Sequence, residues 1–498
     1  MSNTATQAAY ARKAPDEIES FRNHIDGQWS ESQTGALFDD VNPADTGDIV
    51  GRFPASSAAD AAAAVRAAST AFAGWKKTPI STRAKILNRA ADYLEANVDR
   101  FAAELTREQG KALNLSKDEV LRSAQTLRFY AVEGQTFAGE TFPNDDADMI
   151  VYTQREPLGV VSVITPWNFP VSIPARKIAP ALITGNTVVF KPSSDAPLTG
   201  YRLTEAFVAA GLPKGVLNFI TGSAAEVGPA ITVPPEVRAI SFTGSTRAGE
   251  EIHRAVSFAT RTQLELGGKN PLIVMEDADL DEAVDLTIKG GLSLSGQACT
   301  GTSRVLVMRG VKAAFTEKLV TKVKALKVGS GMVAGNTIGP LATARQLETV
   351  LRYIEIGKRE ATLLCGGERL TGPVYDSGYY VSPAIFTDVT NTMRIAREEI
   401  FGPVIGLIEV TSYADAIAKA NDSEYGLSAA IVTRNPRHIH DFANDIASGT
   451  VKINRTTTGN LINAPFGGLK RSSSSTFRES GRTGLEFYTQ IKTIYRGC

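Results

Sequence analysis

The sequence has few cysteines, no excess of either charge and no long apolar run, and each absence excludes a class of protein. Its three cysteines, Cys299, Cys365 and Cys498, are an odd and sparse set, which argues against a disulfide framework and favours a reducing compartment. Lys plus Arg and Asp plus Glu number 53 each, so no overall field attracts nucleic acid or an anionic membrane. No segment reaches the ~18 apolar residues of a membrane span. We therefore expect no nucleic-acid partner, no membrane association and a cytoplasmic location.

Histidine is also scarce. The four histidines have no CxxC or HExxH partner, so we expect no metal site. Residues 1–21 lack the apolar core of a signal peptide and carry several acids, which argues against a targeting segment.

What the chain does contain is a long alternation of strand and helix patterns. A chain of 498 residues exceeds one hydrophobic core, which favours a large two-lobed molecule. The first 137 residues are mostly helical, except for a hairpin with Asp26-Gly27 as its turn, and Ser57 and Asp60 predict a helix start. The alternation after residue 149 predicts an α/β fold with doubly wound parallel sheets. We expect helices over 57–73, 81–98, 104–109, 117–132, 175–182, 199–210, 225–231, 281–292 and 315–326, and strands over 149–154, 159–164, 187–190, 216–219, 239–242, 271–274, 303–308, 404–408, 429–432, 451–454 and 486–495.

Cys299 stands in a stretch of small and hydroxyl-bearing residues, LSGQACTG, directly after a predicted helix. Small neighbours leave a sulfur reachable, and backbone N–H groups of a turn lower a thiol pKa, so Cys299 is a candidate nucleophile. A buried, inert cysteine is the alternative that this stretch alone leaves open.

Ligands of open α/β sheets bind at the carboxyl ends of the strands, and several chemically suitable turns follow predicted strands here. Two prolines stiffen the turn TPWNFP (165–170), and Lys191 is placed to reach a ribose hydroxyl or a phosphate, although a surface lysine would look the same. The turn from Gly244 to Gly249 opens a helix and suits a diphosphate, but it is neither GxGxxG nor a P-loop. Glu265 lies in an apolar setting, either as a general base or as a structural acid paired with Lys269.

Taken in order, these turns resemble the motifs of the aldehyde dehydrogenase superfamily. The motifs are PWNFP, KPS, FTGS, LELGGK, GQxCT, EIFGPV and PFGG, closing on FYTQIK (487–492), and the resemblance extends from about residue 27 to the end. It implies two Rossmann-like lobes, one that binds the cofactor (1–137 and 157–267) and one that is catalytic (268–466). It also implies a small β lobe (138–156 and 467–498) that joins a homodimer or homotetramer, consistent with the exposed edge strand expected at 486–495.

The resemblance also implies a role for each motif residue. Cys299 would attack a small-molecule aldehyde, Asn168 and the Cys299 backbone N–H would hold the oxyanion, Glu265 would activate the hydrolytic water, and Lys177 would support Asn168 and a proton path. The cofactor would be NADP or NAD. Its expected contacts are Thr165, Pro166, Trp167, Lys191, Ser193, Ser194, Thr243, Gly244, Ser245, Gly249, Leu266, Gly267, Glu399 and Phe401, and Arg176, Phe169 and Phe466 are the expected substrate contacts.

Two departures from the family pattern bear on specificity. Many NAD-preferring members have an acid at the fourth position of KPxE, where this chain has Ser194; a hydroxyl does not repel a 2′-phosphate, so we expect NADP to be accepted and even preferred. Arg176 replaces a common tryptophan of the substrate tunnel, as in the semialdehyde-oxidising branches, where arginine pairs with the distal carboxylate. Its alternative role is a salt bridge to an acid of the protein.

An acidic semialdehyde is therefore the favoured substrate class. The local sequence around Arg176 and the motif FRESG (477–481) are most similar to those of 2-oxoglutarate semialdehyde dehydrogenases. Succinate semialdehyde and broad-range aliphatic aldehydes are the alternative substrates. A cysteine-dependent hydrolase is a remote alternative that would require a histidine base, and no histidine lies in any motif turn. A non-catalytic binding protein is another, although it would have no need to keep Cys299, Glu265 and Asn168.

Overall fold

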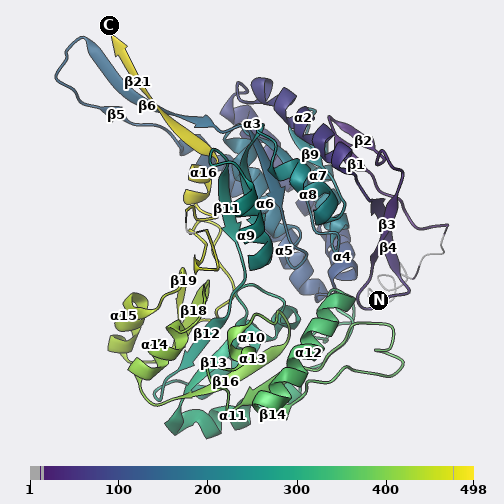
Figure 1. Cartoon of the computed structure of the whole chain (residues 1–498), viewed down its shortest axis with the longest axis vertical. Helices are drawn as coiled ribbons and strands as arrows, with labels where there is room; N and C mark the ends of the chain where they lie inside the picture. Colours follow the sequence, from purple (N-terminus) through teal and green to yellow (C-terminus); the bar gives the residue numbers. More distant parts are fainter. Residues whose placement is uncertain (1–11, 13–15, 475, 498) are drawn as a thin grey trace.

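The computed structural model describes residue 12 and residues 16–474 and 476–497. Cys498, Ser475 and most of the N-terminal arm lie outside these ranges. The chain forms two stacked α/β lobes, and a narrow β arm projects from the first of them (Figure 1).

The first lobe is built on a seven-stranded sheet in which five consecutive strands, starting from the edge strand β11, are parallel. Helices α2, α8 and α9 cover one face and helices α3, α5, α6 and α7 cover the other, which gives the three layers of a doubly wound fold. In sheet order the strands are β11 (Arg261–Glu265), β10 (Val237–Thr243), β7 (Val160–Ile164), β8 (Thr187–Lys191), β9 (Leu217–Phe219), β1 (Asn23–Ile25) and β2 (Gln28–Ser30). The helices of this lobe are α2 (Ala58–Trp75), α3 (Ile80–Ala96), α4 (Val98–Gln109), α5 (Leu113–Thr136), α6 (Ser172–Ile183), α7 (Pro197–Ala209), α8 (Ala224–Thr232) and α9 (Thr246–Ala255).

The second lobe repeats the design with another seven-stranded sheet, parallel except for one edge strand. Its two faces form separate cores, one against α10 and α11 and the other against α12, α14 and α15. In sheet order the strands are β14 (Thr362–Cys365), β15 (Ala384–Thr387), β16 (Val404–Val410), β13 (Thr302–Met308), β12 (Asn270–Val274), β18 (Ser428–Val432) and β19 (Thr450–Ile453). The helices are α10 (Leu280–Gly291), α11 (Arg309–Lys324), α12 (Ala344–Glu360), α13 (Arg394–Arg397), α14 (Tyr413–Asn421) and α15 (Pro436–Asp445), with the 3₁₀ turn η1 (Ser293–Gly296) after α10.

The arm is a three-stranded antiparallel sheet made from two distant parts of the chain (Figure 1). Strand β6 (Met149–Pro157) pairs along its whole length with the C-terminal strand β21 (Thr489–Gly497), and β5 (Thr141–Phe142) adds a short edge. The remaining elements are the hairpin β3 (Leu37–Val41) and β4 (Ile49–Pro54), the pair β17 (Tyr425–Gly426) and β20 (Leu469–Lys470), and the short helix α16 (Thr483–Phe487).

The predicted α/β class and the doubly wound sheets are confirmed, and the differences have local causes. The Asp26-Gly27 hairpin and the Ser57–Asp60 capping box both form. The expected strand over 486–495 is wrong in its first part, because residues through 487 close the helix α16 and the strand begins only at Thr489. The expected helix 104–109 is the second half of α4, whose start at Val98 was placed in the preceding helix because only Asn97 separates α3 from α4.

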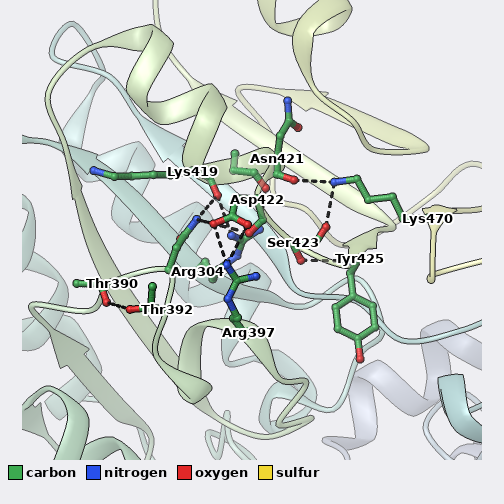
Figure 2. A network of polar contacts seen from close by, with 12 residues as sticks. Arg304, Thr390, Thr392, Arg397, Lys419, Asn421, Asp422, Ser423, Tyr425 and Lys470 are labelled. Carbon is green, nitrogen blue, oxygen red and sulfur yellow. Dashed lines mark hydrogen bonds and ion pairs between the residues drawn. The ribbon is translucent and has the colours of Figure 1, made fainter.

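The buried side chain of Arg304 stabilises a loop of the second lobe. Arg304 on β13 donates to the backbone carbonyls of Lys419 and Ala420, at 3.0 and 2.9 Å. Arg397 forms an ion pair with Asp422 at 2.9 Å beside it (Figure 2). These contacts hold the loop after α14 in place, and this loop leads to a surface groove described below.

Candidate active site

The carboxyl ends of the first sheet bring the sequence-predicted turns side by side. Thr243 and Glu265 are paired at the ends of β10 and β11. Beside them, the backbone N–H of Thr165 donates to the carbonyl of Lys191, at 3.2 Å, where β7 and β8 end. Turns that are 100 residues apart in the sequence thus share one edge, as the strand-end rule predicts.

The Cys299 stretch reaches this edge from the second lobe through an unusual turn. Leu294 and Ser295 have φ of 56° and 54°, in the left-handed region, and Gly296 continues it with φ of 70°. A Cβ at Gly296 would lie 2.1 Å from the carbonyl oxygen of Gly402, so only glycine fits. Asn270 holds the other side of the turn by donating to the carbonyl of Cys299 at 2.8 Å.

Cys299 opens onto a cavity of about 290 Å³ between the two lobes. The cavity brings together Cys299, Glu265 and the three predicted substrate contacts, Phe169, Arg176 and Phe466. Its other lining residues are Lys111, Leu115, Asp118, Glu119, Arg122, Ser172, Ile173, Thr243, Leu266, Lys289, Ser293, Leu294, Ala298, Thr300, Leu427, Thr458, Gly459, Asn460 and Glu479. A small molecule could therefore contact the thiol and a distant arginine at the same time.

The resting thiol is not activated by its surroundings. Burial, followed by the charges of Glu399 and Glu265, raises the pKa of Cys299 to about 12. A turn N–H, that of Thr300, lowers this pKa as expected, but desolvation and two carboxylates outweigh it. Cys299 is a neutral thiol at physiological pH until a base removes its proton.

Asn168 lies beside the Cys299 turn with its side chain aimed at it. Its amide Nδ2 donates to the carbonyl of Gln297 at 3.0 Å, and its buried Oδ1 has no hydrogen-bond partner among the described residues. The Cys299 backbone N–H likewise makes no hydrogen bond within the described ranges. Lys111 fixes the Asn168 backbone by donating to its carbonyl at 2.7 Å. Asn168 thus lies against the Cys299 turn but does not line the cavity, and its role at an oxyanion together with the Cys299 backbone N–H stays a prediction.

Glu265 is a buried acid without a protein partner. Neither carboxylate oxygen makes a hydrogen bond within the described part of the chain. Burial first, and then the charge of Glu479, raise the pKa of Glu265 well above its usual range. The structural alternative, a pair with Lys269, does not form, because the Lys269 ammonium donates to the carbonyl of Glu398 at 2.7 Å. An acid with a raised pKa that faces a cavity is suited to proton transfer.

A third acid, Glu479, joins the site and was not a predicted site residue. Its carboxylate forms ion pairs with Lys177 at 2.7 Å and with Arg176 at 3.1 Å. It arrives through an antiparallel bridge between Glu479 and Phe466. Lys177 therefore pairs with Glu479 and donates to the Ser241 hydroxyl, at 3.0 Å, rather than to Asn168 as expected.

Arg176 forms the salt bridge to a protein acid that was its alternative role, and it also lines the cavity. Its side chain is 15% exposed, and one nitrogen donates to Glu479. Its guanidinium lies 5.6 Å from the centre of the Phe466 ring, so the cation and the aromatic together form one wall. The only sequence signal for Glu479 was its place in the FRESG motif.

A second cavity, a surface groove of about 490 Å³, contains part of the predicted cofactor site. Ser245 and Glu399 line it, together with Thr246, Arg247, Tyr353, Arg397, Glu398, Ser423, Glu424 and Tyr425. The ammonium of Lys470 donates to the carbonyls of Asn421 and Ser423 and fixes the wall that carries Tyr425 (Figure 2). Burial raises the pKa of Glu399 to about 7, and one of its oxygens accepts from the backbone N–H of Gly268 at 3.0 Å.

The glycines of this region act partly in packing. A Cβ at Gly267 would lie 2.1 Å from a carboxylate oxygen of Glu399, and one at Gly268 would lie 2.6 Å from the Cys299 carbonyl. Gly249 is buried, and an added Cβ would lie 2.4 Å from Leu266. Gly249 therefore lets α9 pack closely against Leu266, and the diphosphate role of the turn from Gly244 to Gly249 stays a prediction.

The other predicted cofactor contacts lie close to the strand ends. Lys191 is buried and donates to the carbonyl of Pro192 at 2.9 Å, and burial lowers its pKa to about 8. Ser194 donates to the carbonyl of Gly222 at 3.0 Å and Ser193 donates to Asp195 at 3.2 Å.

Aromatic rings from the two lobes also meet here. The rings of Trp167, next to Pro166, and Phe401 meet edge to face with centres 5.4 Å apart. Because each ring comes from a different lobe, the contact joins the two halves of the site.

The rival hydrolase chemistry finds no support in this geometry. None of the four histidines lines the Cys299 cavity, and His24 and His253 instead lie beside Leu217 and Thr262. Within the described residues, no group of three histidine, cysteine or acidic side chains is placed to hold a metal ion. No helix in the same ranges is long and apolar enough to cross a membrane.

The chain is similar to known proteins over nearly its whole length. The model of the aldehyde dehydrogenase family matches residues 29–494. The chain is 45% identical to an alpha-ketoglutaric semialdehyde dehydrogenase of Bacillus subtilis (strain 168), over 96% of this chain and 98% of that one. It is 41% identical to a 2,5-dioxopentanoate dehydrogenase of Saccharolobus solfataricus, over 93% and 97%.

Solved structures show the same fold. Betaine aldehyde dehydrogenase of Staphylococcus aureus in complex with NAD⁺ has a TM-score of 0.94 at 33% identity, covering 99% of this chain and 97% of that one. A 3,6-anhydro-L-galactose dehydrogenase in complex with NADP has a TM-score of 0.92 at 34% identity, covering 96% and 100%. The chain has this fold, and its site contains a reachable cysteine, an acid without a partner and an asparagine amide beside the cysteine turn. Because the family model and the relatives also match over nearly the whole chain, the protein belongs to the aldehyde dehydrogenase family.

Proposed function

We propose that this enzyme oxidises an acidic semialdehyde, such as 2-oxoglutarate semialdehyde, to the carboxylate with NADP or NAD. The observation that carries the proposal is the single cavity that exposes Cys299 and Glu265 and also contains a cationic wall at Arg176. The semialdehyde names of the relatives from Bacillus subtilis and Saccharolobus solfataricus support the same substrate class.

The chemistry follows from the groups around the sulfur. A base, Glu265 or a water that it orders, removes the Cys299 proton, and the thiolate attacks the aldehyde carbon to give a thiohemiacetal. The Asn168 amide and the Cys299 backbone N–H stabilise the negative charge on its oxygen. When bound, the nicotinamide cofactor supplies the hydride acceptor for the oxidation to a thioester. Glu265 then deprotonates the water that hydrolyses the thioester and frees Cys299.

The residues of the groove and of the strand ends fit such a cofactor. Glu399 and Lys191 would hold ribose hydroxyls, and Ser245 and Thr246 would meet the diphosphate at the N-terminus of α9. Ser194 leaves room and no negative charge for a 2′-phosphate, which supports use of NADP. The NAD⁺ and NADP complexes of the structural neighbours are compatible with either choice.

The test is the growth of reduced-nicotinamide absorbance with a panel of acidic and neutral aldehydes. We expect the highest kcat/KM with 2-oxoglutarate semialdehyde, followed by succinate semialdehyde, and no activity in Cys299→Ala. Equal kcat/KM for acidic and neutral aldehydes of the same length would reject the substrate class, and activity in Cys299→Ala would reject the mechanism. A preference for NAD over NADP would reject the cofactor preference alone.

The predicted lobes and the assembly belong to the same proposal. We assign cofactor binding to residues 1–137 and 157–267, catalysis to 268–466, and assembly into a homodimer or homotetramer to 138–156 and 467–498. The arm supports the assembly role because β21 carries Ile491 and Tyr495 with 62% and 70% of their surface exposed. The sparse cysteines support a cytoplasmic location.

A further inference from the structure

We propose that Arg122 on helix α5 supplies the principal counter-charge for the distal carboxylate of the substrate. This inference rests on the proposed function and names the residue that sets the preference for acidic aldehydes. It places the charge selection on a different helix from Arg176.

Arg122 is placed to meet a ligand of the catalytic cavity. Its side chain lines the same 290 Å³ cavity as Cys299 and is only partly exposed. It also lines a small side pocket together with Arg176, so the two arginines lie next to each other in both cavities. An aldehyde held at Cys299 can therefore extend its far end toward both guanidinium groups.

The two arginines differ in their partners. The charge of Arg176 is offset by Glu479, at 3.1 Å. No hydrogen bond or ion pair within the described ranges involves the guanidinium of Arg122. Burial and the positive charge of Arg176 both lower the pKa of Arg122, which shows a cation in an unfavourable field.

The acids closest to Arg122 along the helix do not neutralise it. Glu119 is three residues away but accepts from the ammonium of Lys111 at 2.5 Å and from the backbone N–H of Ser172 at 3.1 Å. Asp118, four residues away where helical ion pairs form, is exposed and makes no ion pair in the described part of the chain. After burial, the positive charge of Arg122 is the second cause that lowers the pKa of Lys452, so a further cation, and no acid, faces Arg122 there. A partly buried guanidinium without a counter-ion favours an anionic ligand.

The paired Arg176 and the unpaired Arg122 thus divide the task. Arg176 retains hydrogen-bond donors toward the cavity, and its charge is partly offset by Glu479, which it shares with Lys177. Arg122 contributes a positive charge that no acid of the described residues offsets by an ion pair. Discrimination between an acidic and a neutral aldehyde therefore depends chiefly on Arg122.

The experiment measures kcat and KM of the holoenzyme for 2-oxoglutarate semialdehyde and for pentanal, its neutral counterpart of the same chain length. We expect Arg122→Gln to lower kcat/KM for the acidic substrate about 10- to 100-fold, mainly through KM, because a charge-assisted hydrogen bond is lost. The value for pentanal should change less than about threefold, and Arg122→Lys should restore part of the preference.

Two control variants separate this role from general effects. Lys324→Gln removes an exposed cation at the end of helix α11, outside the cavity, and should leave the acidic-to-neutral ratio nearly unchanged, because exposed charges are screened. Arg128→Gln removes a surface ion pair from the same helix and reports on the stability of α5 alone. Glutarate, used as a competitive inhibitor against pentanal, should bind more weakly to Arg122→Gln by the same factor as the acidic substrate.

The outcomes distinguish the two proposals. If the wild-type enzyme prefers the acidic aldehyde and Arg122→Gln keeps that preference and its glutarate inhibition, the role of Arg122 is wrong and the substrate class stands. If the wild-type enzyme treats both aldehydes alike, the substrate class and the role of Arg122 both fail. If Arg122→Gln does not fold, Arg122→Lys decides: an unchanged ratio there overturns the inference, and an intermediate ratio supports it.

Discussion

Removing the negative charge of Glu479 should destabilise the protein and shift its activity to lower pH. The substitution Glu479→Gln keeps the size of the side chain but leaves Lys177 and Arg176 without their shared counter-charge. Side-chain exposure is 0% for Lys177, 3% for Glu479 and 15% for Arg176, so water cannot replace the lost carboxylate at Lys177, whereas Arg176 borders the cavity.

The magnitude follows from this burial. Breaking a buried ion pair by removing one partner typically costs about 3–5 kcal/mol, because an uncompensated charge remains inside. We expect a loss near the lower end of that range, about 3 kcal/mol, because the amide oxygen can still accept from Lys177. The same substitution in an exposed pair, Glu95→Gln beside Arg128, should cost about 1 kcal/mol or less, since both side chains are more than a third exposed.

Catalysis offers a second measurement of the same change. The charge of Glu479 is the second cause, after burial, of the raised pKa of Glu265. Removing it favours the ionised form of Glu265, so the acidic limb of the kcat/KM profile should move to lower pH. A loss of stability without this movement is the result expected if Glu479 only holds the fold together.

The assays are urea titration of each variant and kcat/KM measured across pH. A Glu479→Gln variant within 1 kcal/mol of the wild type would show that the buried pair carries little of the stability. An acidic limb that stays in place or moves to higher pH would refute the electrostatic link between Glu479 and Glu265.

Three further substitutions test the site at separate points. Glu265→Gln should lower kcat/KM at neutral pH about 100-fold or more and abolish the acidic limb, because the base whose raised pKa sets that limb is gone; a retained limb would assign it to another group. Ser194→Glu should lower the ratio of kcat/KM for NADP to that for NAD about tenfold or more through repulsion of the 2′-phosphate, and an unchanged ratio would separate Ser194 from the adenosine ribose. Gly268→Ala should reduce activity about tenfold or more with an intact circular dichroism spectrum, because its Cβ would lie 2.6 Å from the Cys299 carbonyl. The control Gly74→Ala, whose Cβ would have no atom within 4 Å, should leave activity unchanged. Full activity in Gly268→Ala would show that the Cys299 turn can shift freely.

Much of the fold was predictable because the parallel strands are buried on both faces and therefore form continuous apolar runs. Val188, Val189 and Phe190 are fully buried, and such runs are the clearest signal a sequence offers for a central strand. Strand β15 was missed because loops with glycine and proline surround it. Helix α12 was also missed, although Leu347, Val350 and Ile354 follow a helical period. The tail was misread because the helix α16 has only five residues, too few for a helical period to show.

The candidate catalytic residues were predicted for a different reason. Cys299, Glu265 and Asn168 each occur in a motif that resembles one of the aldehyde dehydrogenase family, and each lies at or after the end of a strand or helix, so we expect them near one edge of the sheets. Their protonation states could not be predicted. The pKa of Cys299 is raised because the two lobes together enclose the sulfur with Glu399 and Glu265, and no local sequence records that enclosure.

The charges that face the substrate show most clearly what the sequence alone does not predict. Sequence comparison directs attention to Arg176, because it replaces a familiar aromatic, yet the counter-charge that partly offsets it, Glu479, is 303 residues away. Arg122 attracts no attention in sequence, because an arginine on an amphipathic helix usually faces water. Only the folded chain shows that the conspicuous arginine is paired and the inconspicuous one is not. Specificity for an acidic aldehyde therefore depends on the balance of all charges around the cavity, and a substitution at Glu479 would alter it as surely as one at either arginine.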